Sequence, residues 1–192
     1  MDAILNVHIC KNLFLCNRQK TNFYLLVMPG DKPFKTKELS KQMGIKRNMK
    51  QIITEFLKTE PYYISAMSNI SAVIMDQMPD LNWAGFYLVR EGQLVVGPFQ
   101  GKPACIHIAR GRGVCGTCLD RDKTIVVPDV HKFPGHIACD SASNSEIVIP
   151  IHKDGDVAAV LDIDSPVPDR FSEDDRALLE GVVEAMEKML EW

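Results

Sequence analysis

The sequence predicts an α+β fold, an antiparallel sheet with N- and C-terminal helices packed on one face and functional loops on the other. Apolar residues recur at helical spacing in residues 48–60, 62–78 and 171–192. Between these stretches, apolar and polar residues alternate, and the dipeptides at 91–92 ("EG") and 154–155 ("DG") mark two hairpin turns. Helices on either side of a run of hairpin strands are typical of this architecture.

The helical stretches have recognisable boundaries. Pro61 and Pro79 follow the first two stretches, where a proline stops one helix or opens the next. The third helix follows Ser172, a good N-cap residue, and its first turn is acidic, which the helix dipole favours. Its buried stripe is expected to contain Leu178, Leu179, Val182, Val183, Met186 and Leu190.

Six stretches have the composition of strands. The hairpin turns join 82–90 to 93–99 and 145–153 to 156–165, and the single strands are 104–109 and 124–130. The stretch "DVAAVLDIDS" is apolar enough to lie at the centre of the sheet. A short helix is expected over 114–122. The polar segment 128–145 is a long loop of the kind that usually carries function.

The first 40 residues differ from the rest of the chain. They lack a clear periodicity and are expected to form a poorly ordered N-terminal extension to a domain over residues 41–192. Residues 36–47 are expected to form a polar amphipathic helix rather than a helix-turn-helix, because no recognition helix follows them. The roles of Cys10 and Cys16, which lie in this extension, stay open.

Composition narrows the functional class. The net charge of −3 and the isoelectric point of about 5.9 indicate neither a nucleic-acid partner nor an anionic membrane. No apolar run is long enough to span a membrane, and the N-terminus lacks the features of a signal peptide, so a cytoplasmic protein is expected. In that reducing compartment the six cysteines are expected to be buried, catalytic or metal-bound.

Five motifs resemble the free methionine-(R)-sulfoxide reductases of the GAF domain family. They are "NWAGFYL" (82–88), "GPFQGKPAC" (97–105), "GRGVCG" (111–116), "DVHKFPGHIACDSASNSEIVIPI" (129–151) and "VLDIDS" (160–165). The resemblance covers residues 50–192 and implies a GAF-like catalytic domain that reduces free L-methionine-(R)-sulfoxide. It also implies thioredoxin as the reductant and requires no cofactor or metal. Paired GAF domains further suggest a homodimer.

The resemblance assigns roles to three cysteines. It makes Cys139 the thiol that attacks the sulfoxide and Cys105 the thiol that closes the disulfide, with Cys115 as a relay or auxiliary resolving thiol. The order of Cys105 and Cys115 stays open. Cys118 has no counterpart in the family pattern and is expected to be a packed thiol, with a backup resolving thiol as the alternative.

A free amino acid also needs groups that bind its two ends. Glu146, Asp162 and Asp164 are suited to its ammonium group, and the two aspartates share one face of a strand because side chains alternate along it. Burial and mutual repulsion would keep one of these carboxyls protonated, so that it can hydrogen-bond the sulfoxide oxygen, but the sequence leaves open which one.

The remaining parts of the substrate need an apolar wall and an anion site. The resemblance places Trp83 and Tyr87, four residues apart on one strand face, against the S-methyl end, with packed core aromatics as the alternative. The N-terminus of the helix at 114–122 could hold the substrate carboxylate, and Arg110 and Arg112 are weaker candidates.

The same residues allow two other interpretations. One is a GAF sensor that binds a small molecule without converting it, although such modules usually stand beside an effector domain. The other is a zinc site, although a zinc ribbon needs a second C-x-x-C motif. Its candidate ligands are Cys105, Cys115, Cys118, Cys139, His107, His131 and His136.

Overall fold

The computed structural model describes residues 10–16, 23–29, 49–137 and 139–192. The chain divides into two units, residues 1–46 and residues 47–192. In the first unit, β1 (Cys10–Cys16) and β2 (Phe23–Pro29) pair as an antiparallel ladder, which the sequence pattern did not indicate. The helix expected over 36–47 lies outside the described residues, as does much of the expected extension.

The second unit is built on a six-stranded sheet, and every pair of neighbouring strands is antiparallel. The strand order is β5-β4-β3-β8-β7-β6, so β3 and β8 lie at the centre as the apolar composition of β8 predicts. The strands are β3 (Trp83–Arg90), β4 (Gln93–Gly101), β5 (His107–Ile108), β6 (Ile125–Val127), β7 (Ser145–Lys153) and β8 (Asp156–Ser165).

Both predicted hairpins form. Glu91 and Gly92, which join β3 to β4, both have positive φ angles, of 51° and 78°. Asp154 and Gly155, which join β7 to β8, have φ angles of 54° and 92°. Two successive residues in the left-handed region give the turn whose twist matches that of paired strands, which is why these dipeptides specify hairpins.

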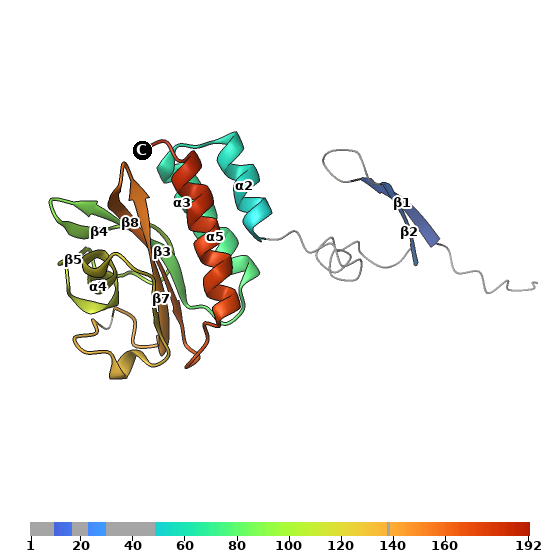
Figure 1. Ribbon diagram of the computed structural model, residues 1–192. Helices are drawn as coiled ribbons and strands as arrows, with labels where there is room; N and C mark the ends of the chain where they lie inside the picture. The colour runs from blue at the N-terminus through green and yellow to red at the C-terminus, as the bar shows by residue number, and fades with distance from the viewer. Residues whose placement is uncertain (1–9, 17–22, 30–48, 138) are drawn as a thin grey trace, which may run out of the picture. The chain divides into compact units, whose positions relative to one another are not determined.

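Three helices lie on one side of the sheet (Figure 1). α3 (Tyr63–Gln77) and α5 (Glu173–Met189) pack against its strands, and α2 (Met49–Thr59) packs against these two helices. Their apolar stripes and one face of the sheet form a single core, in which Ile53, Met67 and Leu161 are fully buried. Ser172 and Asp175 form a capping box that starts α5 where the sequence predicts.

The opposite face of the sheet carries α4 (Gly113–Arg121), the short 3-10 helix η1 (Val130–Lys132) and the long loops. Side chains alternate between these two layers, so Phe86 lies in the helical core while Tyr87 packs in a second core beneath α4. The predicted α+β fold, with helices on one face and loops on the other, is therefore confirmed.

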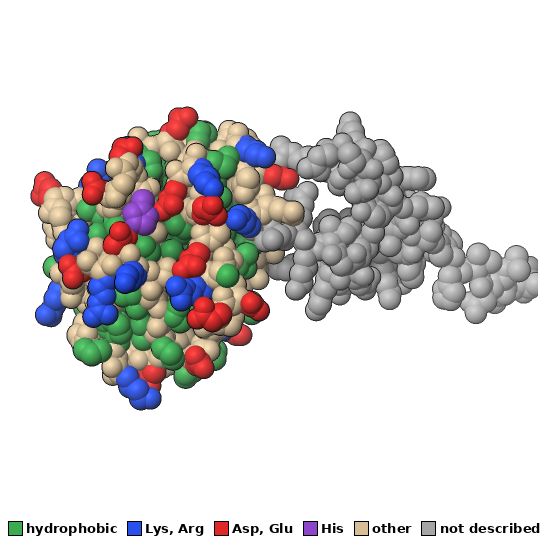
Figure 2. All heavy atoms as spheres, in the orientation of Figure 1, with side chains coloured by type: hydrophobic (Ala, Val, Ile, Leu, Met, Phe, Trp, Pro, Cys, Tyr) green, Lys and Arg blue, Asp and Glu red, His purple; other side chains and the backbone are tan. Residues whose placement is uncertain are grey.

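Two strands are shorter than predicted. The stretch 104–109 contributes only the two residues of β5, and 124–130 contributes only the three of β6. Among the described helices, none combines the length and apolar character that crossing a membrane requires. Figure 2 shows acidic and basic side chains interspersed over one face of residues 49–192.

Candidate active site

A pocket opens on the face of the sheet that carries α4. It encloses about 510 Å³ including its open mouth, and its walls come from β3, β7, β8, the start of α4 and the two loops that hold Cys105 and Cys139. Of the eight site residues predicted from sequence, all but Cys105 line it. They are Trp83, Tyr87, Cys115, Cys139, Glu146, Asp162 and Asp164.

The two loops at the pocket mouth are joined by a disulfide between Cys105 and Cys139. The Cα atoms of the pair are 5.7 Å apart, and 34 positions separate the two residues in the sequence. Cys105 lies between β4 and β5, and Cys139 lies between η1 and β7. The fold thus brings together two cysteines that the resemblance pairs, and it places their bond at the pocket.

The carboxyl groups project from the central strands. Asp162 and Asp164 alternate along β8 with core residues, and Glu146 on β7 lies directly opposite Asp164 in the strand register. Glu146 and Asp162 are only 5% and 6% exposed. Burial raises the pKa of Asp162 to about 6. Burial and the charge of Asp162 raise the pKa values of Glu146 and Asp164 well above the ordinary range.

One oxygen of Asp162 stands out within this cluster. Among the described residues, no group hydrogen-bonds its buried Oδ1 atom, whereas Asp164 is held by the hydroxyl of Ser143. A buried carboxylate oxygen without a partner is costly, so a cationic or hydrogen-bond-donating ligand at this atom would be favoured.

Cys115 and His136 surround Glu146. The Sγ atom of Cys115 lies 3.8 Å from Glu146 Oε1, and the Nε2 atom of His136 lies 3.9 Å from Glu146 Oε2. Burial, together with the nearby acids, raises the pKa of the Cys115 thiol, and burial lowers the pKa of His136. The pKa of Glu146 is itself raised, so the surroundings favour the uncharged form of all three groups.

Trp83 and Tyr87 form the aromatic wall of the pocket, and a third ring, Phe99, stacks on Trp83. Trp83 stacks on Tyr87 with ring centroids 5.8 Å apart and on Phe99 with centroids 5.2 Å apart. A Cβ atom at Gly85 would lie 2.7 Å from the Trp83 ring, and one at Gly101 would lie 2.5 Å from it. These two glycines therefore give the indole room to lie flat between the strands.

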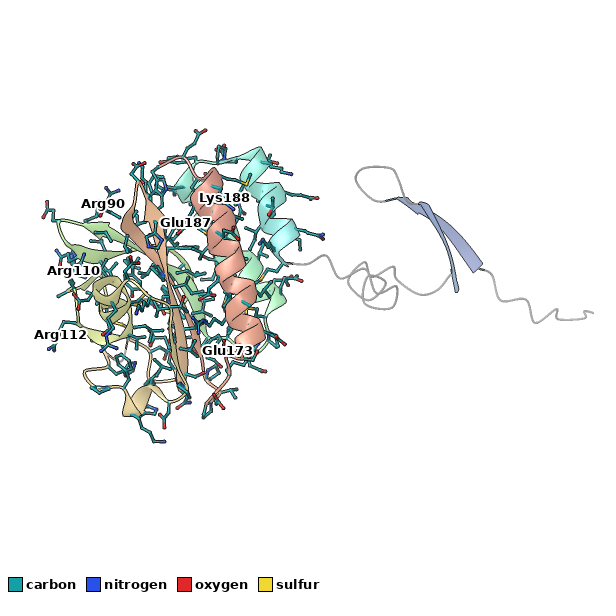
Figure 3. All side chains as sticks on the ribbon, in the orientation of Figure 1. Arg90, Arg110, Arg112, Glu173, Glu187 and Lys188 are labelled. Atoms are coloured by element: carbon teal, nitrogen blue, oxygen red, sulfur yellow. A yellow bond between two sulfur atoms is a disulfide. The ribbon has the colours of Figure 1, made fainter. Side chains whose placement is uncertain are left out.

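The start of α4 borders the pocket. The N-cap residue Arg112 makes no side-chain capping hydrogen bond, and Gly113 begins the helix with a φ of 60° that an L side chain rarely adopts. Both residues line the pocket, so the first turn of α4, whose amide groups have no partner within the helix, lies beside the space that a ligand would occupy. Arg110 serves another purpose, because its guanidinium donates to the carbonyl of Leu119 and ties α4 to its preceding loop (Figure 3).

Within the described residues, one group has the composition and spacing to hold a metal ion. Cys115, Glu146 and Asp162 offer ligand atoms that all lie within 4.8 Å of one another. This set differs from the cysteine and histidine ligands considered from sequence. Cys118 is instead a fully buried free thiol packed in the core beneath α4.

Comparison with known proteins identifies the family to which this chain belongs. Residues 55–190 match the GAF domain. The free methionine-R-sulfoxide reductase of Escherichia coli (strain K12) is 49% identical over 131 residues, which are 68% of this chain and 79% of that protein. This chain belongs to the GAF domain family, among the free methionine-R-sulfoxide reductases. It is therefore an oxidoreductase.

Solved structures agree with this assignment. The structure of fRMsr of Staphylococcus aureus in its reduced form has a TM-score of 0.72 and 48% sequence identity, covering 74% of this chain and 93% of that one. The free methionine-R-sulfoxide reductase from Neisseria meningitidis, solved in complex with its substrate, has a TM-score of 0.71 and 36% identity, covering 82% of this chain and 92% of that one.

Sequence reasoning missed several polar residues around the pocket. Asp140 and Ser143 line it, and Asn82 hydrogen-bonds both of them. His136 was considered only as a zinc ligand. The signal was present in the segment "HIACDSASNSE", whose density of short polar side chains around Cys139 exceeds what a connecting loop requires. The chemical roles of the pocket residues remain predictions.

Proposed function

We propose that this protein reduces free L-methionine-(R)-sulfoxide to L-methionine through a cysteine sulfenic acid and an intramolecular disulfide. The observation that carries the proposal is the meeting of a buried carboxyl cluster and an aromatic wall beside the Cys105–Cys139 bond. The carboxyls suit the ammonium group of a free amino acid, the wall suits its S-methyl end, and the cysteine pair suits two-electron reduction.

In the first step the Cys139 sulfur attacks the sulfoxide sulfur. The sulfoxide oxygen is transferred to Cys139, which becomes a sulfenic acid, and the two electrons of the thiol sulfur reduce the substrate to the thioether. The proton of the thiol ends on the sulfenic oxygen, so one thiol and one sulfoxide give one sulfenic acid and one thioether. A proton donor beside the sulfoxide oxygen lowers the barrier by stabilising the charge that develops there.

The carboxyl groups divide between two roles in this proposal. Asp162 has a pKa of about 6 and is mostly ionised at neutral pH, so its free Oδ1 binds the substrate ammonium. Glu146 has a pKa raised well above its ordinary value and keeps its proton, so it donates to the sulfoxide oxygen. The amides at the start of α4 receive the substrate carboxylate.

In the second step the Cys105 thiol attacks the sulfenic sulfur of Cys139. The S–S bond forms, the S–O bond breaks, and water leaves with the thiol proton.

We propose that thioredoxin then reduces the disulfide, in the cytoplasm. The fully buried Cys118 is not accessible to a reductant, and Cys115 is an auxiliary thiol. The homodimer suggested by the family resemblance stays a prediction, which sedimentation analysis of the purified protein would test.

The proposal is tested by product analysis. The purified protein, thioredoxin and a reductant are incubated with free methionine sulfoxide of each epimer and with a peptide that contains the sulfoxide, and methionine is measured. Only the free R epimer should be reduced. Cys139→Ser should abolish turnover, and Cys105→Ser should release about one methionine per chain without thioredoxin-dependent recycling, as expected for a trapped sulfenic acid.

A small-molecule sensor is the alternative, and the same assay separates it. Binding of the free sulfoxide without methionine release, in the wild-type reduced protein, would overturn catalysis and support a sensor. Retained turnover in Cys139→Ser would instead disprove the role assigned to that cysteine.

A further inference from the structure

Asn82 and Trp83, at the start of β3, each contact one of the two loops that carry the disulfide cysteines. The Nδ2 group of Asn82 donates to Asp140 Oδ2 at 3.2 Å and to Ser143 Oγ at 3.0 Å. The indole N–H of Trp83 donates to the backbone carbonyl of Lys102 at 3.1 Å. Asp140 follows Cys139 directly, and Lys102 lies three positions before Cys105.

The two loops are also joined to each other at this place. The Nζ atom of Lys102 lies 3.2 Å from Asp140 Oδ1, and that oxygen also accepts the Ala142 backbone N–H at 3.0 Å. These contacts form a ring that runs from Asn82 through Asp140 and Lys102 to Trp83, the residue that follows Asn82 in the chain. The ring of contacts is anchored to the sheet, because the Asn82 backbone N–H donates to the Asp164 carbonyl on β8.

Burial decides which of these contacts carry the most weight. The Asp140 side chain is 8% exposed and Ser143 is 4% exposed, whereas the Lys102 side chain is 69% exposed. The hydrogen bonds from Asn82 are therefore shielded from water, while the Lys102 ion pair is weakened by solvent. The Ala142 N–H, Asn82 and Lys102 together lower the pKa of Asp140, which keeps it a charged acceptor.

Neither cysteine of the pair lies on a helix or a strand, so the sheet does not position them directly. A disulfide forms only when the Cα atoms come within about 4.4–6.8 Å, and here they are 5.7 Å apart. Contacts that keep the two loops near this separation would therefore favour closure while Cys139 is a sulfenic acid, before any bond joins them.

We propose that Asn82 and Asp140 are positioning residues that hold the Cys139 loop against the Cys105 loop for disulfide closure. In the cell, the oxidant that converts Cys139 to the sulfenic acid is the free methionine sulfoxide, and in this respect the inference rests on the proposed function. The step itself is attack of the Cys105 thiol on the Cys139 sulfenic acid, which forms the S–S bond and releases water. By favouring rapid closure, Asn82 and Asp140 prevent the Cys139 sulfenic acid from being oxidised further.

The test uses the reduced full chain and follows closure separately from substrate chemistry. One equivalent of hydrogen peroxide converts Cys139 to the sulfenic acid, with water as the other product, and quenched samples are analysed by mass spectrometry with and without dimedone. Asn82→Ala should slow disulfide closure about tenfold and shift the product toward the dimedone adduct, since a hydrogen bond to a charged group is worth about that factor. Asp140→Asn should act in the same direction.

Controls separate positioning from a general loss of structure. Asn69→Ala is the matched variant, because Asn69 makes one exposed hydrogen bond within α3, and it should close at the wild-type rate. Lys102→Met should slow closure only about twofold, because the ion pair is exposed, and Lys102→Arg should restore it. In a single turnover with the sulfoxide, Asn82→Ala should release methionine within about twofold of wild type, which a structural defect would not allow.

Equal closure rates in wild type, Asn82→Ala and Asp140→Asn would overturn the proposal. So would an equal slowing of methionine release and closure in Asn82→Ala, since that result would show a disturbed pocket. Failure of the wild type to reduce the sulfoxide would overturn the proposed function alone, because peroxide-driven closure still reports on the two positioning residues.

Discussion

Replacing Asp162 with asparagine should stabilise the protein while it disables the site. The pKa of this carboxyl is about 6 in the folded chain against an ordinary value of 3.8, and burial is the main cause. The side chain is 6% exposed, so water does not screen the effect. A difference of about two pKa units corresponds to about 3 kcal/mol at 1.36 kcal/mol per unit.

The sign follows from proton linkage. The folded state binds the Asp162 proton more tightly than the unfolded state, so folding is most favoured below pH 3.8, where both states are protonated. The free energy of unfolding falls as the pH rises from about 4 to about 6, and the full penalty is present above that. Asparagine carries no such charge, and its substitution also removes the charge that raises the pKa values of Glu146 and Asp164.

The measurement is thermal or denaturant unfolding of the reduced wild type and Asp162→Asn at several pH values. At pH 7 the variant should be more stable by about 3 kcal/mol, which for a chain of this size raises the melting temperature by roughly 6–12 °C. The advantage should shrink toward zero near pH 4. Asp120→Asn, which changes an exposed carboxyl on α4, serves as the control and should not show this pH-dependent difference.

A variant that is no more stable than wild type at pH 7 would refute the reasoning. So would a difference that does not change between pH 4 and pH 7, because a packing gain would then explain it. Turnover provides the second half of the test, since Asp162→Asn should lower kcat/KM for the free sulfoxide by losing the partner proposed for the ammonium group.

Three further predictions concern packing. Gly116→Ala should lower the free energy of unfolding by about 2–3 kcal/mol in denaturant titrations, because its Cβ atom would lie 2.3 Å from the Ala109 carbonyl oxygen. Cys118→Ala should cost about 1 kcal/mol of stability but leave kcat within about twofold, since this thiol is free and fully buried; a large loss of turnover would restore it as a resolving thiol. Ser172→Ala should cost about 1 kcal/mol in the same titrations by removing the α5 capping box, and an unchanged midpoint would contradict that role.

Much of the catalytic unit was predictable from sequence because its signals are local. Hydrophobic spacing predicted α2, α3 and α5, and two dipeptides that favour positive φ angles predicted the hairpins. The period of a strand likewise predicted that Asp162 and Asp164 share a face, and both line the pocket. Each of these features depends on neighbours within a few positions along the chain.

The features that sequence missed depend on contacts between distant segments. Asn82 bonds residues 58 and 61 positions away, and no periodic pattern marks such a partner. The proposed division of roles between Asp162 and Glu146 depends on burial and on an oxygen without a partner, which only the packed structure reveals. The β1–β2 ladder was missed for a different reason, because residues 1–40 show no clear alternation of side chains.

The carboxyl groups of the pocket lie on strands, whereas its disulfide cysteines lie on loops. The carboxyls project from β7 and β8, which are hydrogen-bonded on both sides within the sheet, so their spacing and raised pKa values are fixed before a substrate arrives. The disulfide cysteines instead lie on loops, which suits the proposed mechanism, in which Cys139 first reaches the substrate sulfur and then Cys105. In that mechanism a rigid acid cluster serves the first step, and side chains such as Asn82 hold the two loops together for the second.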